Sequence, residues 1–133
     1  MPGPIKKLPA FFYRTKAGKE PVLEWLRSLD QEDRRAIGNA LAVVEFGWPV
    51  GMPVCRALEG EKRLWEVRTS ITNGRIARLV FAIVRGRMVI LHGFVKKTRK
   101  TPDKDKALAR QRFKDVERHE EELVEPPRRH LCR

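Results

Sequence analysis

Residues 64–84 have the sequence LWEVRTSITNGRIARLVFAIV, and an Asn-Gly pair at positions 73 and 74 divides them into two halves. Asn and Gly both tolerate positive φ, so this pair between two apolar runs predicts a β-hairpin. Apolar and charged residues alternate in the first half, which places Glu66 and Arg68 on the same face of a strand. The second half carries Arg78 among apolar residues. The hairpin therefore brings three charged side chains to one patch of a sheet.

The segments around this hairpin predict the remaining strands. Residues 11–13 form a short aromatic run suited to a first strand. Residues 54–58 alternate in polarity before a turn at Glu59-Gly60. Residues 88–95 are almost continuously apolar, as expected for a central strand covered on both faces. These runs, with the hairpin between them, predict an antiparallel β-meander.

Three helices are predicted from apolar spacing and from capping residues. The first begins at Pro21, and the second follows Asp30, which is suited to an N-cap. In the last, Thr101 fits the N-cap and Pro102 the first helical position. We therefore expect an α+β fold, a small antiparallel meander with an N-terminal strand and helical hairpin packed on it and a C-terminal helix. Residues 1–118 are predicted to form a single domain, and residues 119–133 a charged, flexible tail.

The charge is concentrated in the middle of the chain. The 133 residues include 29 Lys and Arg against 17 Asp and Glu, a net charge of +12. Residues 63–114 alone hold 15 basic and 3 acidic side chains. Such clustering favours a polyanionic partner, because each cation that neutralises a phosphate releases a condensed counterion.

Several classes of protein are excluded by the same composition. No run approaches the roughly 20 apolar residues that span a bilayer, so no membrane partner is expected. The N-terminus lacks the apolar segment of a signal peptide. Cys55 and Cys132 lie far apart, with no further Cys or His at metal-ligand spacing. We therefore expect a cytoplasmic basic domain that needs no metal and no cofactor.

The element order and two sequence runs resemble the RelE/ParE toxin superfamily. The runs are LWEVR at 64–68 and ILHGFVKKT at 90–98, and they look most like the phage-derived Gp49-like branch, which includes HigB-type toxins. The resemblance covers about residues 10–117. It implies the toxin of a type II toxin–antitoxin system, an endoribonuclease that cleaves mRNA on the ribosome. It also implies a cognate helix-turn-helix antitoxin as partner.

The resemblance carries over to individual residues. Arg78 falls at the family's catalytic strand arginine, and Arg68 at a basic position on the preceding strand. The basic segment after the last strand, with expected contacts to RNA, contains Lys96, Lys97, Arg99 and Lys100. Cleavage through the RNA 2′-hydroxyl needs a base, and the candidates are Glu66 and His92. Glu66 stands where RelE has lysine, and the only tyrosine, Tyr13, lies far from the end of the sheet.

Each assignment has a structural alternative. Arg68 and Arg78 could form a salt bridge with Glu66, and His92 could be a packed, hydrogen-bonded histidine. The lysines could only position a phosphate. Two other functions share the fold: a ParE-like toxin that inhibits DNA gyrase, and a basic protein that binds RNA without catalysis.

Overall fold

A computed structural model describes residues 5–96 and 100–118, and its centre is the predicted meander. The strands that make up the meander are antiparallel neighbours: β2 (Cys55–Ala57), β3 (Trp65–Ser70), β4 (Ile76–Val84) and β5 (Arg87–Lys96). A short strand, β1 (Ala10–Phe12), pairs parallel with β5 at the other edge. The sheet order is β1-β5-β4-β3-β2, so the long and largely apolar strands β4 and β5 lie inside the sheet.

Each of the two tight turns of the meander contains two consecutive residues with positive φ. Asn73 and Gly74 have φ of 61° and 67°, within a short 3-10 turn between β3 and β4. Arg85 and Gly86, between β4 and β5, have φ of 51° and 73°. Paired positive φ values suit the twist of a hairpin. The predicted Asn-Gly hairpin is therefore confirmed.

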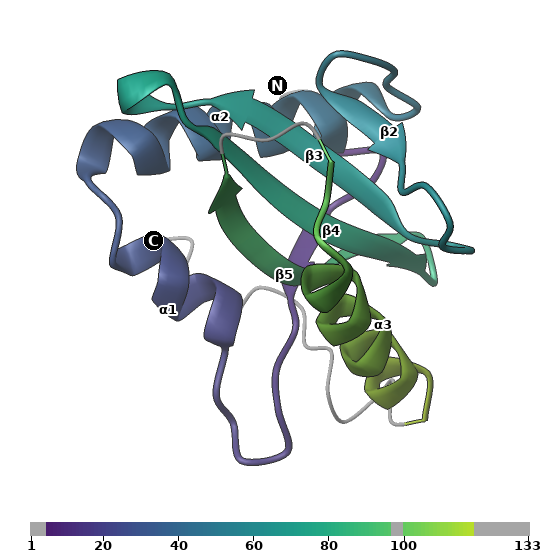
Figure 1. Ribbon diagram of the computed structural model, residues 1–133. Coiled ribbons are helices and arrows are strands. Elements are labelled where there is room, and N and C mark those ends of the chain that lie inside the picture. Colours follow the sequence, from purple (N-terminus) through teal and green to yellow (C-terminus); the bar gives the residue numbers. More distant parts are fainter. Residues whose placement is uncertain (1–4, 97–99, 119–133) are drawn as a thin grey trace.

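Helices cover both faces of the sheet (Figure 1). On one face α1 (Pro21–Arg27) and α2 (Gln31–Gly47) pack against the apolar residues of β3, β4 and β5. On the other face α3 (Asp103–Arg118) packs its apolar stripe against β4 and β5. Figure 1 shows α3 in front of the sheet and α2 passing behind it. No helix within the described ranges is long and apolar enough to cross a membrane.

The predicted α+β fold is confirmed, with three local differences. The sheet is mixed, because β1 pairs parallel with β5, and alternation within a strand does not indicate its partner. Asp30 occupies the N-cap of α2, but its side chain makes no capping hydrogen bond. The last helix begins at Asp103, so the predictions of Thr101 as N-cap and Pro102 as first helical residue were wrong. The Thr101 hydroxyl is used elsewhere, as described below.

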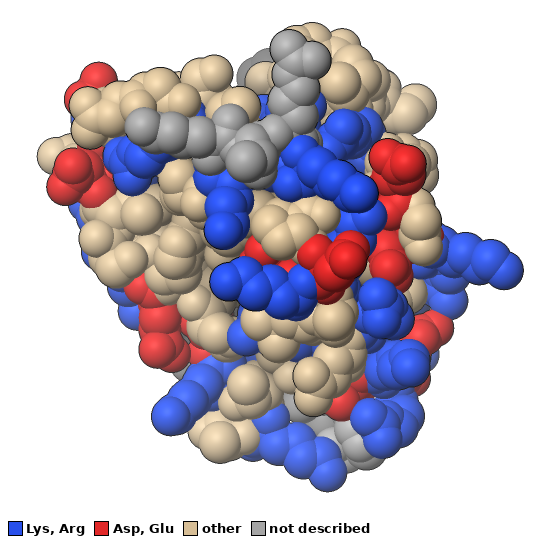
Figure 2. All heavy atoms as spheres, in the orientation of Figure 1, with Lys and Arg blue, Asp and Glu red and all other residues tan. Residues whose placement is uncertain are grey.

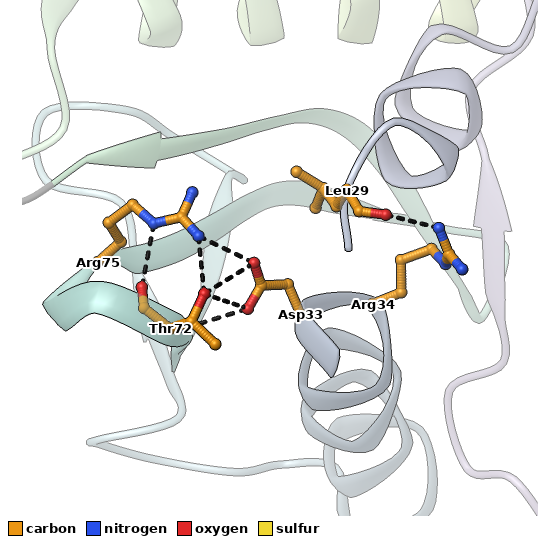
Figure 3. A network of polar contacts seen from close by, with 5 residues as sticks. All are labelled: Leu29, Asp33, Arg34, Thr72 and Arg75. Atoms are coloured by element: carbon orange, nitrogen blue, oxygen red, sulfur yellow. Dashed lines mark hydrogen bonds and ion pairs between the residues drawn. The ribbon is translucent and has the colours of Figure 1, made fainter. Parts of the chain in front are cut away.

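A buried carboxylate fastens the start of α2 to the turn between β3 and β4 (Figure 3). Asp33, 2% exposed, accepts hydrogen bonds from the Thr72 backbone N–H at 3.0 Å and from the Thr72 hydroxyl at 3.0 Å. Arg75 Nη2 donates to the same carboxylate at 2.9 Å. The pKa of Asp33 is held below its usual value, chiefly by the hydrogen bond from the Thr72 backbone. The charged carboxylate is therefore the form that stabilises the fold.

This depressed pKa predicts a pH-dependent effect of Asp33→Asn. Asp33 contributes stability above its unfolded pKa, near 3.8, and this contribution is lost as the pH falls through the lower folded pKa. Asp33→Asn should thus lower the melting temperature at pH 7, and the difference from wild type should shrink below pH 4. Asp30→Asn, at a side chain without a capping bond, is the matched control and should change little. A gap of constant size across pH 3 to 7 would contradict this account.

Gly93 in β5 lets α1 approach the sheet. A Cβ at this position would lie 2.5 Å from Cζ3 and 2.7 Å from Cε3 of the Trp25 ring. Both distances are shorter than carbon atoms tolerate without a shift. Trp25, a residue of α1, packs against the core cluster on this face of the sheet. The glycine is therefore required by space and not by its backbone angles.

Gly93→Ala should lower the free energy of unfolding by about 1–3 kcal/mol, since overpacking displaces the indole. Gly38, exposed in α2, has nothing within 4 Å of the equivalent Cβ. Gly38→Ala should raise the free energy of unfolding by roughly 1 kcal/mol, from helix propensity alone. Urea titrations followed by tryptophan fluorescence would measure both. Equal effects of the two substitutions would exclude a packing role for Gly93.

Candidate functional site

Strand register arranges the polar side chains of the α3 face in three rows. Directly paired residues on neighbouring strands point to the same side of a sheet. The paired residues, row by row from the end of β5, are Ser70, Ile76 and Lys96; then Arg68, Arg78 and Phe94; then Glu66, Val80 and His92. Arg56 of β2 pairs with Glu66 and extends the third row. The predicted charged patch is therefore present on one face.

Glu66 is the centre of this patch. Its side chain is completely buried, and Oε1 accepts a hydrogen bond from Arg56 Nε at 3.2 Å. The Nε atom of Arg68 lies 3.9 Å from the same oxygen. Oε2 accepts a hydrogen bond of 2.5 Å from the Thr101 hydroxyl, which precedes α3. Both carboxylate oxygens are thus used within the protein, as the salt-bridge alternative expects.

The arginines differ in their access to solvent. The side chains of Arg56 and Arg68 are 31% and 16% exposed, so both reach the surface. Arg78 is completely buried. Burial lowers the pKa of the Arg78 guanidinium and the nearby Arg68 and Arg56 act in the same direction, whereas the Glu66 carboxylate favours the charged form. Arg78 lies beneath the patch, and its two neighbours Arg56 and Arg68 reach the surface instead.

Cys55 is a core residue close enough to Glu66 to be affected by its charge. Its side chain is buried. Burial raises the pKa of the thiol to about 11, and the negative charge of Glu66 acts in the same direction. Cys55 is therefore a protonated thiol at neutral pH and has no nucleophilic use.

His92 is held by the first turn of α3. Its Nε2 lies 2.6 Å from Asp105 Oδ1, and its ring stacks on Phe94 with centroids 5.4 Å apart. Burial lowers the pKa of the imidazole, although the hydrogen bond and charge of Asp105 oppose this shift. With Asp105 as acceptor, Nε2 carries the hydrogen and Nδ1 remains able to accept a proton. His92 and Glu66 are two strands apart, a separation of roughly 10 Å.

Basic residues surround this face (Figure 2). The figure shows Lys and Arg side chains gathered over β3 and β4 and beside α3, with acidic groups between them. Lys96 ends β5 in the first row. Lys100 lines a pocket of about 220 Å³ with Arg56, Thr101 and Lys106. Lys97 and Arg99, predicted to contact RNA, lie outside the described residues.

Three residues of the site were missed by sequence reasoning. Arg56 could have been found, since it alternates with Val54 and Leu58 and faces Glu66 once the turn at residues 59–60 is folded. Thr101 and Asp105 gave no such signal. Thr101 was interpreted only as the start of a helix and Asp105 was assigned no role, and their partners lie 35 and 13 residues away in sequence. The described residues contain no group of three or more His, Cys, Asp or Glu side chains that could hold a metal.

Comparison with known families agrees with these features. Residues 24–114 match the phage-derived Gp49-like family. The chain belongs to this family. The match includes α2, the whole meander and most of α3, and the family is one of RelE- and HigB-like toxins. No curated protein matches the chain. The suspected resemblance is therefore confirmed at the level of the family, and a toxin-like protein is consistent with it.

The buried ion pairs of Glu66 predict a large effect of charge removal. Glu66→Gln keeps the shape but leaves Arg56, Arg68 and Arg78 without their carboxylate, and should cost about 3–5 kcal/mol of stability. Glu117→Gln is the matched control, because Glu117 pairs with Arg63 at the surface, and it should cost less than about 1 kcal/mol. Urea unfolding of both variants measures the difference. A loss at position 66 no larger than at 117 would mean that the carboxylate does not hold the cluster.

Proposed function

We propose that this protein is the toxin of a type II toxin–antitoxin pair and that it cleaves mRNA on the ribosome without a metal ion. The observation that carries the proposal is the cluster on the open sheet face, in which Glu66 orients Arg56 and Arg68 toward solvent. A planar guanidinium of fixed charge suits the binding of a phosphate group. Membership of the Gp49-like family supports the same function.

The reaction uses the nucleophile that RNA itself supplies. A base removes the proton of a 2′-hydroxyl, and the oxygen attacks the adjacent phosphorus. A 2′,3′-cyclic phosphate forms as the bond to the 5′-oxygen breaks, and that oxygen leaves with a proton from an acid. Negative charge grows on the phosphate oxygens in the transition state, so fixed cations aimed at this position accelerate the step.

We assign the roles of the site residues from their exposure to solvent. Arg68 and Arg56 reach solvent and bind the phosphate, while Arg78 and Glu66 lie below them and position them. Of the two candidate bases, His92 is favoured. Its lowered pKa keeps the ring neutral near pH 7, and Asp105 orients it. Glu66 has both carboxylate oxygens bonded within the protein.

The same face is also proposed to meet the protein partners. A helix-turn-helix antitoxin would cover the basic sheet surface with an acidic contact surface, and the ribosome would present mRNA to it. The charge supports this assignment, since residues 63–114 hold 15 basic against 3 acidic side chains. Lys96 and Lys100, at the edges of the patch, are expected to contact RNA phosphates.

Translating ribosomes with a defined mRNA test the proposal. The purified chain should cleave the message and leave 2′,3′-cyclic phosphate ends, and it should not affect DNA gyrase in a supercoiling assay. Arg68→Ala should slow cleavage about 100- to 1,000-fold, the usual loss for one donor to a transition state. Arg35→Ala, an exposed arginine of α2 on the opposite side, is the matched control and should cleave like wild type.

The other outcomes separate the rival functions. Inhibition of supercoiling without RNA cleavage would identify a gyrase toxin. Tight RNA binding without cleavage would identify a non-catalytic binding protein. Ends with a 3′-hydroxyl would mean that water is the nucleophile, and wild-type activity of Arg68→Ala would move the site away from this face.

A further inference from the structure

A second pocket adjoins the arginine cluster at Arg68, apart from the pocket that Arg56 and Lys100 line. It has a volume of about 430 Å³, within the usual range of small-ligand sites. Its lining is formed by the segment before β2, the end of β3 and the start of β4: Pro53, Val54, Arg68, Thr69, Ser70 and Ile76. Arg68 is shared between this pocket and the Glu66 cluster. A group held here would thus lie next to one bound by the arginine.

The walls of this pocket combine apolar surface with hydrogen-bonding groups. Pro53, Val54 and Ile76 supply the apolar part, and Thr69 and Ser70 supply hydroxyl groups. A guanidinium plane, such as that of Arg68, also stacks on nucleobases. This mixture matches a nucleobase, which has an apolar face and polar edges, better than a second phosphate.

The strand edge adds backbone groups to the pocket. Strand β2 begins at Cys55. Just before it, the carbonyl oxygen of Val54 accepts a hydrogen bond of 2.7 Å from the Arg68 backbone N–H. Backbone directions alternate along a strand, so the N–H and C=O of Ser70 point to the same side as those of Arg68, the side on which the pocket residue Val54 lies. Such groups are suited to bind the hydrogen-bonding edge of a base.

The pocket on the other side of the cluster has the opposite character. It has a volume of about 220 Å³, and the cationic residues Arg56, Lys100 and Lys106 contribute to its lining. Lys106 Nζ donates to the Glu59 carbonyl at 2.7 Å, which holds its ammonium group at the rim. This pocket therefore favours a phosphate.

We infer that the pocket at the end of β3 is a base-selective subsite for a single-stranded RNA nucleotide, whose neighbouring phosphate is bound by Arg68 and Arg56. The inference rests on the proposed function for its substrate class. A single strand is required, because a base can enter the pocket only when it is unpaired and unstacked. The next phosphate along the strand then falls beside the cationic pocket. Thr69 and Ser70 are the residues that set the base preference.

Binding of short RNA without cleavage tests the inference. Fluorescein-labelled 2′-O-methyl tetranucleotides of A, C, G or U cannot supply the nucleophile, so anisotropy reports affinity alone. The wild-type chain should prefer one base at least about fivefold over another, the discrimination expected from one good base contact. Ser70→Phe fills the pocket and leaves the arginines in place. It should weaken binding of the preferred sequence about tenfold, bring the four affinities within about twofold, and keep the salt dependence.

Two further variants keep the test decisive. Ile76→Phe fills the pocket from the opposite wall and should have the same effect if Ser70→Phe fails to fold. Ser28→Phe, at the exposed end of α1, is the matched control and should bind like wild type. The inference would be overturned if the wild-type chain bound all four tetranucleotides with equal affinity. It would also be overturned if Ser70→Phe or Ile76→Phe folded and kept the full base preference.

Failure of the inference and failure of the proposed function give different results. Cleavage of mRNA without base-selective binding would leave the proposed function standing and refute the subsite. Base-selective binding that is lost in Ser70→Phe, in a chain that cleaves no RNA, would support the subsite and refute the nuclease.

Discussion

Two arginines face each other on neighbouring strands in the middle of this sheet, and the buried carboxylate of Glu66 makes that arrangement stable. Like charges in directly opposite positions destabilise a sheet, and Arg78 is completely buried beside Arg68. Glu66, one position further along β3 on the same face, lies close to both and also binds Arg56. The apolar residues of α3 (Ala109, Phe113 and Val116) belong to a core cluster that also includes Phe94, next to Arg78. The arginines of this face therefore depend on one carboxylate.

The start of α3 depends on the same charges. Thr101 is hydrogen-bonded to Glu66, and Asp105, four residues later, is hydrogen-bonded to His92. This one segment therefore contacts both residues considered as the base. Further along, Phe113 and Val116 enter the apolar core. The helix is thus fixed at its beginning by polar contacts and at its end by burial. A change in either polar contact would shift the helix and the site together, which couples the position of α3 to the geometry of the arginines.

Local chemistry accounts for what could be predicted from sequence. The tolerance of Asn73 and Gly74 for positive φ determined the central hairpin, and alternation assigned Glu66, Arg68 and Arg78 to one face. Contacts between distant segments were not accessible in this way. The bond of Thr101 to Glu66 depends on the path of the chain after β5, and alternation carries no information about that path. The same limit applies to β1, whose parallel pairing with β5 is also a contact between segments far apart in sequence.

The burial of Glu66 also explains why arginines are better suited than carboxylates to carry the proposed chemistry. Glu66 is completely buried with both oxygens bonded, so its contribution is to fix the guanidinium planes around it. Fixed planes need no reorganisation when charge develops on a phosphate, which is where electrostatic catalysis gains most. The proton has to be moved by another group, and His92 lies on the same face with one nitrogen held by Asp105. Separate groups for charge and for proton transfer allow the cluster to stay rigid while the imidazole changes its protonation.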